Sequence, residues 1–182
     1  MSTVTTSEAE SKTNAWSYFE LSNSPVETIR DELEAAVPAE WERIDDAHIS
    51  ILPGFNINAA NVDVALDCIA LLGVGVVGDD VTINGIECFH ELDADQPSFV
   101  VTLDVEMDLE SIRDAQEQWV GNYSGSLNFD PVDPHITLFK AGDGDDEHEP
   151  LSDDQRAELK AAIDDADVPE TLTVESLEAE TY

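Results

Sequence analysis

The segment Asp133-Pro134-His135-Ile136-Thr137-Leu138-Phe139-Lys140 (residues 133–140) places a histidine and a hydroxyl residue two positions apart in an apolar run. A second segment, His48-Ile49-Ser50-Ile51 (residues 48–51), has the same pattern 87 positions earlier, since 135 − 48 = 87. On a strand, residues i and i+2 point to one face while i+1 and i+3 point to the other. Each segment is therefore predicted to be a strand with a histidine and a hydroxyl on one face and apolar side chains behind them.

This pattern suits acid–base chemistry on a phosphate. Imidazole has a pKa near 6.5, so near neutral pH one ring can be neutral and a second one protonated. Two such strands side by side would place a general base and a general acid on opposite sides of a phosphorus atom. The hydroxyls of Ser50 and Thr137 can donate to non-bridging phosphoryl oxygens. The alternative is two ordinary strand histidines; His90 and His148 have no hydroxyl residue at the matching position.

The two segments resemble the paired His-x-Ser/Thr motifs of the 2H phosphoesterase superfamily, above all its RNA 2′,3′-cyclic phosphodiesterase or 2′-5′ RNA ligase (LigT-like) branch. The proline before His135 and the basic residue five positions after it add to the resemblance. The resemblance implies an enzyme without metal or cofactor, in which His48 and His135 are the acid and base. It implies that Ser50 and Thr137 bind the phosphate, with Lys140 as a further phosphate contact where the family usually has Arg.

Residues around the second motif leave alternatives open. By strand alternation Lys140 points away from His135 unless a β-bulge re-aims it, so it is either a phosphate contact or a solvated lysine. Phe139 alternates onto the His135 face, where it either stacks on a nucleobase or packs into the core. The acidic stretch 143–149 resembles a calcium loop in part. It lacks the glycine and the terminal glutamate of an EF-hand, which favours a solvated loop and no metal site.

Apolar periodicity predicts the same order in both halves of the chain: strand, helix, His-bearing strand, helix, strand. A polar, disordered leader is expected over residues 1–14, followed by one bilobal domain over 15–182 with the pattern repeated at about 15–92 and 97–182. We expect an α+β fold with two pseudo-symmetric lobes of antiparallel sheet, helices outside and the active site between the lobes. The expected strands are 16–21, 43–52, 81–92, 98–105, the His135 strand and 171–177, with a hairpin loop at 93–97; the expected helices are about 25–37, 61–72, 109–119 and 152–166.

Charge is the strongest compositional signal. The chain has 42 Asp and Glu against 7 Lys and Arg, a net charge of −35 spread along its whole length. Such a charge destabilises a compact state by self-repulsion, which molar salt screens because the Debye length falls to about 3 Å. An acidic tail for a basic partner would cluster the acids at one end. The composition instead indicates a protein that requires high salt, as in a halophilic archaeon or its virus.

No apolar run has the length of a membrane span, and none resembles a signal peptide, so a cytoplasmic monomer is expected. Together with the resemblance, the motifs predict a metal-independent phosphodiesterase that hydrolyses 2′,3′-cyclic phosphates or 2′-5′ linkages at RNA ends or in nucleotides. The expected product is a 2′-phosphate, and the resemblance also implies reversible 2′-5′ ligation. Two alternatives stay open: degradation of a cyclic di- or oligonucleotide signal, and a non-catalytic nucleotide- or RNA-binding module on the same fold. A binding module has no need of two histidines.

The acidic composition generates the first prediction. Raising KCl from dilute buffer to molar concentration should increase both the folded fraction and the turnover, because salt screens acid–acid and acid–phosphate repulsion. A cyclic mononucleotide should be preferred over long RNA at every concentration. Circular dichroism and turnover measured along one KCl series test this, and maximal activity of a fully folded protein in dilute buffer would contradict it.

Overall fold

The structure is a computed structural model that describes residues 12–58, 60, 62–90, 99–130, 132–141 and 151–182. Within these ranges an eight-stranded antiparallel sheet and four α-helices form an α+β fold, as predicted. No helix of the described residues is long and apolar enough to cross a membrane. The strands are β1 (Lys12–Leu21), β2 (Glu42–Arg43), β3 (His48–Asn58), β4 (Asp80–His90), β5 (Phe99–Glu106), β6 (Ser126–Leu127), β7 (His135–Lys140) and β8 (Thr171–Thr181), and the helices are α1 (Asn23–Leu33), α2 (Val62–Leu71), α3 (Glu110–Asn122) and α4 (Asp153–Asp165), with a 3₁₀ turn, η2, at Val74–Val76.

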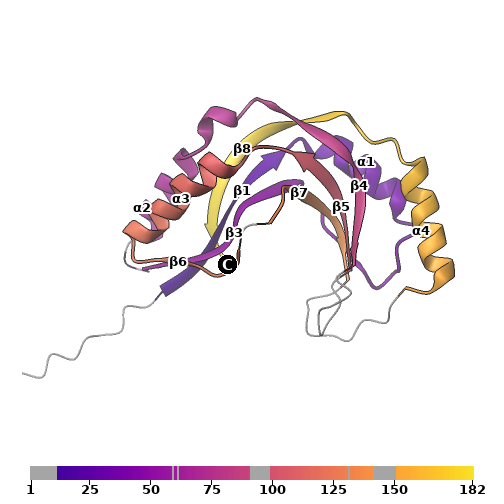
Figure 1. Cartoon of the computed structure of the whole chain (residues 1–182), viewed down its shortest axis with the longest axis horizontal. Helices are drawn as coiled ribbons and strands as arrows, with labels where there is room; N and C mark the ends of the chain where they lie inside the picture. Colours follow the sequence, from indigo (N-terminus) through magenta and orange to yellow (C-terminus); the bar gives the residue numbers. More distant parts are fainter. Residues whose placement is uncertain (1–11, 59, 61, 91–98, 131, 142–150) are drawn as a thin grey trace, which may run out of the picture.

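The sheet has the strand order β2-β7-β5-β4-β8-β1-β3-β6. Strand β8 joins its two parts, because the beginning of β8 pairs with β4 and the rest pairs with β1. The sheet bends into an arch with β3 and β7 on its inner side (Figure 1). The predicted hairpin is confirmed by the antiparallel pairing of β4 with β5 up to His90 and Phe99, while the loop residues 93–97 lie outside the described residues.

Four helices cover the outer side of the arch (Figure 1) and divide it into two lobes. We call β1, β3, β6 and the end of β8, with α2 and α3, the first lobe. We call β2, β7, β5, β4 and the start of β8, with α1 and α4, the second lobe. Two separate clusters of buried apolar side chains form the cores: a larger one that includes Ile29 of α1 and Leu159 of α4, and a smaller one that includes Ile69 of α2 and Val120 of α3.

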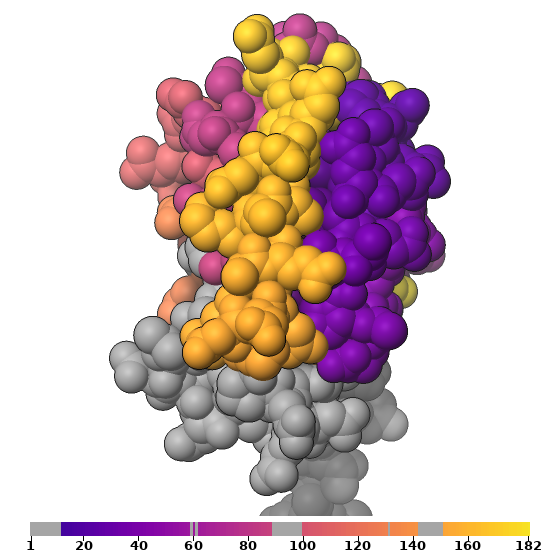
Figure 2. Space-filling model, turned by 90° about the vertical axis from the view of Figure 1, so that its right-hand side faces the viewer, coloured from indigo at the N-terminus to yellow at the C-terminus, as the bar shows by residue number. Residues whose placement is uncertain are grey.

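The lobes do not coincide with the halves of the sequence. Helix α1 follows β1 of the first lobe but packs against α4 of the second lobe. Figure 2 shows the same exchange from the side, where the C-terminal segment runs from α4 into β8 alongside the N-terminal segment. Each half still has the predicted order of elements, so the pattern repeats along the chain while the two copies are interleaved in space.

Two predicted boundaries were wrong. The single strand expected over 43–52 is two strands, β2 and β3, because β2 pairs with β7 in the second lobe and β3 pairs with β1 in the first. The chain crosses between the lobes at residues 44–47, where the strand is interrupted. The leader expected over 1–14 is also too long, since β1 begins at Lys12 and pairs with the end of β3. Residues 1–11 lie outside the described residues.

Candidate active site

The first motif lies on β3 with the alternation expected of a strand. Ile49 and Ile51 are completely buried in the larger core, whereas His48 and Ser50 are partly exposed on the opposite face. In the ladder with β1, His48 lies opposite Glu20 and Ser50 lies opposite Tyr18. The histidine and the hydroxyl therefore emerge together on the inner side of the arch.

The second motif lies on β7 in the same way. Ile136 and Leu138 are completely buried, and His135 and Thr137 are partly exposed. Strands β3 and β7 lie near each other on the inner side of the arch (Figure 1), although four strands separate them in the order of the sheet. The structure thus brings the two motifs together between the lobes.

Electrostatics link the two imidazoles. Burial is the largest influence on His48 and lowers its pKa below the ordinary value of 6.5, and the nearby His135 lowers it further. A backbone hydrogen bond and the carboxylate at Asp46 act in the opposite direction. The net shift favours a neutral His48 at neutral pH, which is the state that a general base needs.

Two aromatic side chains of β1 cover His48. The Trp16 ring is edge-on to the imidazole with a centroid distance of 5.0 Å, and the Tyr18 ring lies at 5.5 Å. The sequence shows these aromatics two residues apart on one strand, yet it does not show that β1 is the neighbour of the His48 strand. They account for part of the burial that lowers the pKa of His48.

A backbone carbonyl two residues before each histidine orients its ring. His135 Nδ1 lies 2.8 Å from the carbonyl oxygen of Asp133, and the His48 ring donates a hydrogen bond to the backbone of Asp46. Because a carbonyl only accepts, His135 must carry a proton on Nδ1, which leaves Nε2 as the atom for chemistry. Both motifs read Asp-x-His-Ile-Ser/Thr, so the repeated aspartate is a signal in the sequence beyond the histidine and the hydroxyl residue.

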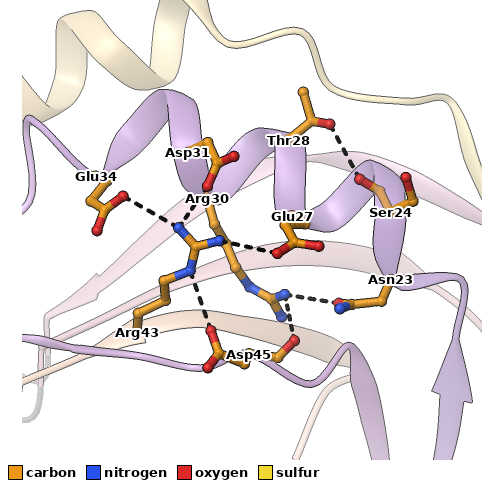
Figure 3. Close-up of polar contacts among 9 residues, drawn as sticks. All are labelled: Asn23, Ser24, Glu27, Thr28, Arg30, Asp31, Glu34, Arg43 and Asp45. Atoms are coloured by element: carbon orange, nitrogen blue, oxygen red, sulfur yellow. Dashed lines mark hydrogen bonds and ion pairs between the residues drawn. The ribbon is translucent and has the colours of Figure 1, made fainter.

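A buried arginine holds the approach to the first motif. Arg30 of α1 is completely buried, and its Nη1 donates to the carbonyl of Asp45 at 2.7 Å and to the Asn23 side chain at 2.8 Å (Figure 3). Asp45 stands three residues before His48. Beside it, Arg43 forms ion pairs with four carboxylates on α1, directly after α1 and on the chain leading to β3, including Asp31 at 2.7 Å and Asp45 at 3.3 Å.

A second arginine holds the approach to the second motif. Nη2 of Arg113 on α3 donates to the carbonyl of Val132 at 2.6 Å, again three residues before the histidine. Its Nε donates to the carbonyl of Ile51 on β3 at 2.9 Å, within the first motif. Helix α3 belongs to the first lobe and α1 to the second, so each arginine contacts the segment that leads into the motif strand of the opposite lobe. We call these contacts the two arginine ties.

A β-bulge near the end of β7 determines the directions in which Phe139 and Lys140 point. Thr137 pairs with Thr102 while Phe139 pairs with the next residue, Val101, so Leu138 is the extra residue. The bulge turns Phe139 into the larger core, where it is only 2% exposed. The expectation of Phe139 as a base contact is therefore wrong, and core packing is what the structure shows.

The same bulge re-aims Lys140. Because Val100 and Thr102 share a face, their partners Lys140 and Thr137 share the face of the site. The Lys140 ammonium forms an ion pair with Glu42 at 3.0 Å. Binding to a phosphate would require the lysine to exchange this partner. The acidic stretch 143–149 lies outside the described residues.

The proximity of the two histidines can be measured directly. By NMR titration the pKa of His48 should lie below 6.5 in the native protein and rise towards 6.5 in His135→Gln, because the neighbouring positive charge is lost. Since folding favours the neutral ring, stability should fall as the pH drops below about 6.5 towards the pKa of the folded state. His148→Gln, outside both motifs, is the control. An unchanged His48 titration in His135→Gln would show that the rings do not interact.

The Arg113 tie should control the spacing of the motifs. On the 2′,3′-cyclic nucleotide substrate expected from the sequence, Arg113→Gln should lower kcat by about 100-fold, since a displacement of about 1 Å has that effect. Arg113→Lys should show a similarly low kcat, because a lysine ammonium lacks the planar fork with which a guanidinium contacts two carbonyls. Arg156→Gln is the matched control, since Arg156 donates to the carbonyl of Leu151 within the α4 region. If folded Arg113→Gln keeps kcat within twofold of native, the tie does not position the motifs.

No protein-family model matches the sequence, and no curated protein matches it. Solved structures do match over nearly the whole chain. A crystal structure of a phosphoesterase has a TM-score of 0.54 at 13% identity and covers 93% of this chain and 88% of its own. The MHV ns2 PDE domain has a TM-score of 0.53 at 15% identity and covers 93% of this chain and 99% of its own.

A third match is E. coli LigT in complex with 3′-AMP, with a TM-score of 0.51 at 13% identity, covering 93% of this chain and 87% of its own. Usb1 from Kluyveromyces marxianus has the same TM-score and identity, and the match covers 92% of this chain and 93% of Usb1. At these identities the likeness concerns the fold. The chain therefore shares its bilobal α+β fold with these solved structures, over 92–93% of its length.

Proposed function

We propose that the protein is a metal-independent phosphodiesterase that opens 2′,3′-cyclic phosphates, or hydrolyses 2′-5′ linkages, at RNA ends or in nucleotides. The observation that carries this proposal is the convergence of His48 and His135 between the lobes, each with its ring donating a hydrogen bond to the backbone of the aspartate two residues earlier. A hydroxyl residue accompanies each histidine on the same face. The fold supports the proposal, since LigT, Usb1 and the ns2 PDE domain share it.

His48 takes the role of general base in this proposal. Its lowered pKa keeps the ring neutral at neutral pH, so it can accept a proton from the attacking water. The water oxygen forms a new bond to phosphorus while the bond from phosphorus to the 3′ oxygen breaks. Protonated His135 donates its Nε2 proton to that leaving oxygen, which yields a 3′ hydroxyl and a 2′-phosphate. The scheme uses one water and two imidazoles and requires no metal ion.

Neutral donors stabilise the phosphate in this scheme. The Ser50 and Thr137 hydroxyls lie beside the two histidines and can donate to the non-bridging oxygens. Lys140 can add a charge when it leaves Glu42, 3.0 Å away. Hydroxyl donors at a site with few cations suit a small substrate with one reacting phosphate better than a long polyanion.

The two histidines should be essential and act as a unit. His48→Ala and His135→Ala should each reduce turnover of a 2′,3′-cyclic nucleotide by about 10²- to 10⁴-fold, with the double variant little worse than either single one. His148→Ala is the control histidine, and chromatography of the product should show a 2′-phosphate.

Two results would contradict the proposal. Near-native turnover in either single variant would remove that histidine from the mechanism. A native protein that binds nucleotides tightly in molar KCl but turns over neither cyclic phosphates nor 2′-5′ dinucleotides would be a binding module on this fold. Turnover confined to cyclic dinucleotides would instead indicate a signal-degrading enzyme that uses the same two histidines.

A further inference from the structure

Beyond His48, the inner face of the first lobe continues as a surface of aromatic and amide side chains. Along β1 the residues on this face are Tyr18, Trp16 and Asn14, because alternate residues share a face. Tyr18 lies opposite Ser50, and Asn14 lies opposite Asn56. The surface therefore begins at the phosphate-binding hydroxyl of the proposed site and extends along the strands towards β6.

Exposed aromatic rings lie at the far end of this surface. Phe129 is 60% exposed and Tyr182 is 63% exposed, which is unusual for side chains of this size. Both approach Gly54 of β3: a Cβ atom there would lie 2.7 Å from Cδ2 of Phe129 and 3.1 Å from the Tyr182 hydroxyl. The glycine thus allows the two rings to lie directly against the strand. Trp16, on the same face, packs against Tyr18 with a centroid distance of 4.3 Å.

An amide network supports the rings. Nδ2 of Asn56 donates to Ser126 and to Oδ1 of Asn128, both at 2.9 Å. Nδ2 of Asn128 lies 3.4 Å from Oδ1 of Asn14 and 3.5 Å from the Tyr182 hydroxyl. These side chains come from β1, β3, β6, the segment after β6 and the residue after β8. The network therefore holds the aromatic residues in place through contacts between distant parts of the chain.

The charge of the surface indicates which part of a ligand it accepts. Glu178 and Glu180 lie opposite Tyr18 and Trp16 on β8, and the Glu180 carboxylate accepts hydrogen bonds from Trp16 Nε1 at 3.1 Å and Tyr18 Oη at 3.2 Å. These carboxylates repel a phosphate. The rings and amides beside them are uncharged and suit a flat, neutral group with polar edges.

The length of the surface sets the size of that group. Tyr18 and Asn14 are four residues apart, which is about 13 Å along a strand. A nucleoside whose phosphate is bound at Ser50 spans only part of this length, so its base would lie beside Trp16 and extend towards the rings next to Gly54. Stacking on aromatic side chains contributes binding energy with any base, and its strength varies with the size of the ring system.

We propose that Trp16, Phe129 and Tyr182, with Asn56 and Asn128, form a nucleobase subsite that favours purines. This rests on the proposed function only in placing the reacting phosphate at Ser50. The subsite selects substrates by the uncharged base and so provides affinity that the acidic surface does not gain from phosphates. We call these five residues the base platform.

The test compares substrates that differ in the base. Turnover is measured in molar KCl on 2′,3′-cyclic AMP, 2′,3′-cyclic CMP and glycerol 1,2-cyclic phosphate, which has the five-membered cyclic ester and no base. Native protein should prefer cyclic AMP in kcat/KM. Phe129→Leu and Tyr182→Leu should each lower the ratio of cyclic AMP to glycerol cyclic phosphate by at least about fivefold, as expected for loss of stacking on one base. Leu71→Ala, an exposed apolar residue of α2, is the control and should leave the ratio unchanged.

Binding of adenosine separates this proposal from the proposed function. Adenosine has no phosphate, so in NMR titrations it should shift the side-chain amide signals of Asn56 and Asn128 in both native protein and His135→Gln. Phe129→Leu should weaken that binding by a similar factor. If the native protein shows no turnover but these shifts appear, the catalytic proposal fails and the base platform stands. Substrate ratios within twofold of native in both platform variants, or adenosine shifts confined to residues outside the platform, would overturn it.

Discussion

The spacing of the two histidine strands is the constraint on which the rest of the site depends. Strands β3 and β7 are separated by β5, β4, β8 and β1 in the sheet, so no ladder of backbone hydrogen bonds sets the distance between them. The curvature of the sheet brings them near each other, and the arginine ties join the lobes. Arg113 contacts Ile51 and Val132 with one guanidinium, so a shift of either motif would break a hydrogen bond in a partly buried environment.

The protein has few Lys and Arg side chains that could bind an anion. All seven Lys and Arg residues lie in the described part of the chain, and three of the four arginines have structural partners at the motifs or next to them. Lys140 is ion-paired with Glu42. In the proposed function, a phosphate at this site would therefore depend on hydroxyl donors and on the imidazoles. This arrangement fits molar salt, where long-range attraction of a polyanion by surface cations is screened.

The two histidines share one geometry and have different surroundings. Both rings donate a hydrogen bond to the backbone of the aspartate two positions earlier, which matches the pseudo-symmetry of the lobes. His48 has the two aromatic neighbours from β1, and burial lowers its pKa. A symmetric scaffold can thus support an asymmetric pair of roles, because the pKa depends on the local environment more than on the backbone. Trp16 belongs both to this environment and to the proposed base platform.

The sequence by itself determined the features that depend on local periodicity. Alternation on a strand placed His48 with Ser50 and His135 with Thr137, and apolar spacing predicted the order of strands and helices in each half. The tertiary structure decided what depends on distant partners. The bulge at Leu138 exists only in the register between β7 and β5, and it moves Phe139 into the core and Lys140 onto the site face. The interruption between β2 and β3 likewise follows from the interleaved lobes. So do the hydrogen bonds of Arg30 and Arg113 with the opposite lobe. These contacts join residues far apart in the sequence, and periodicity carries no signal for such pairs.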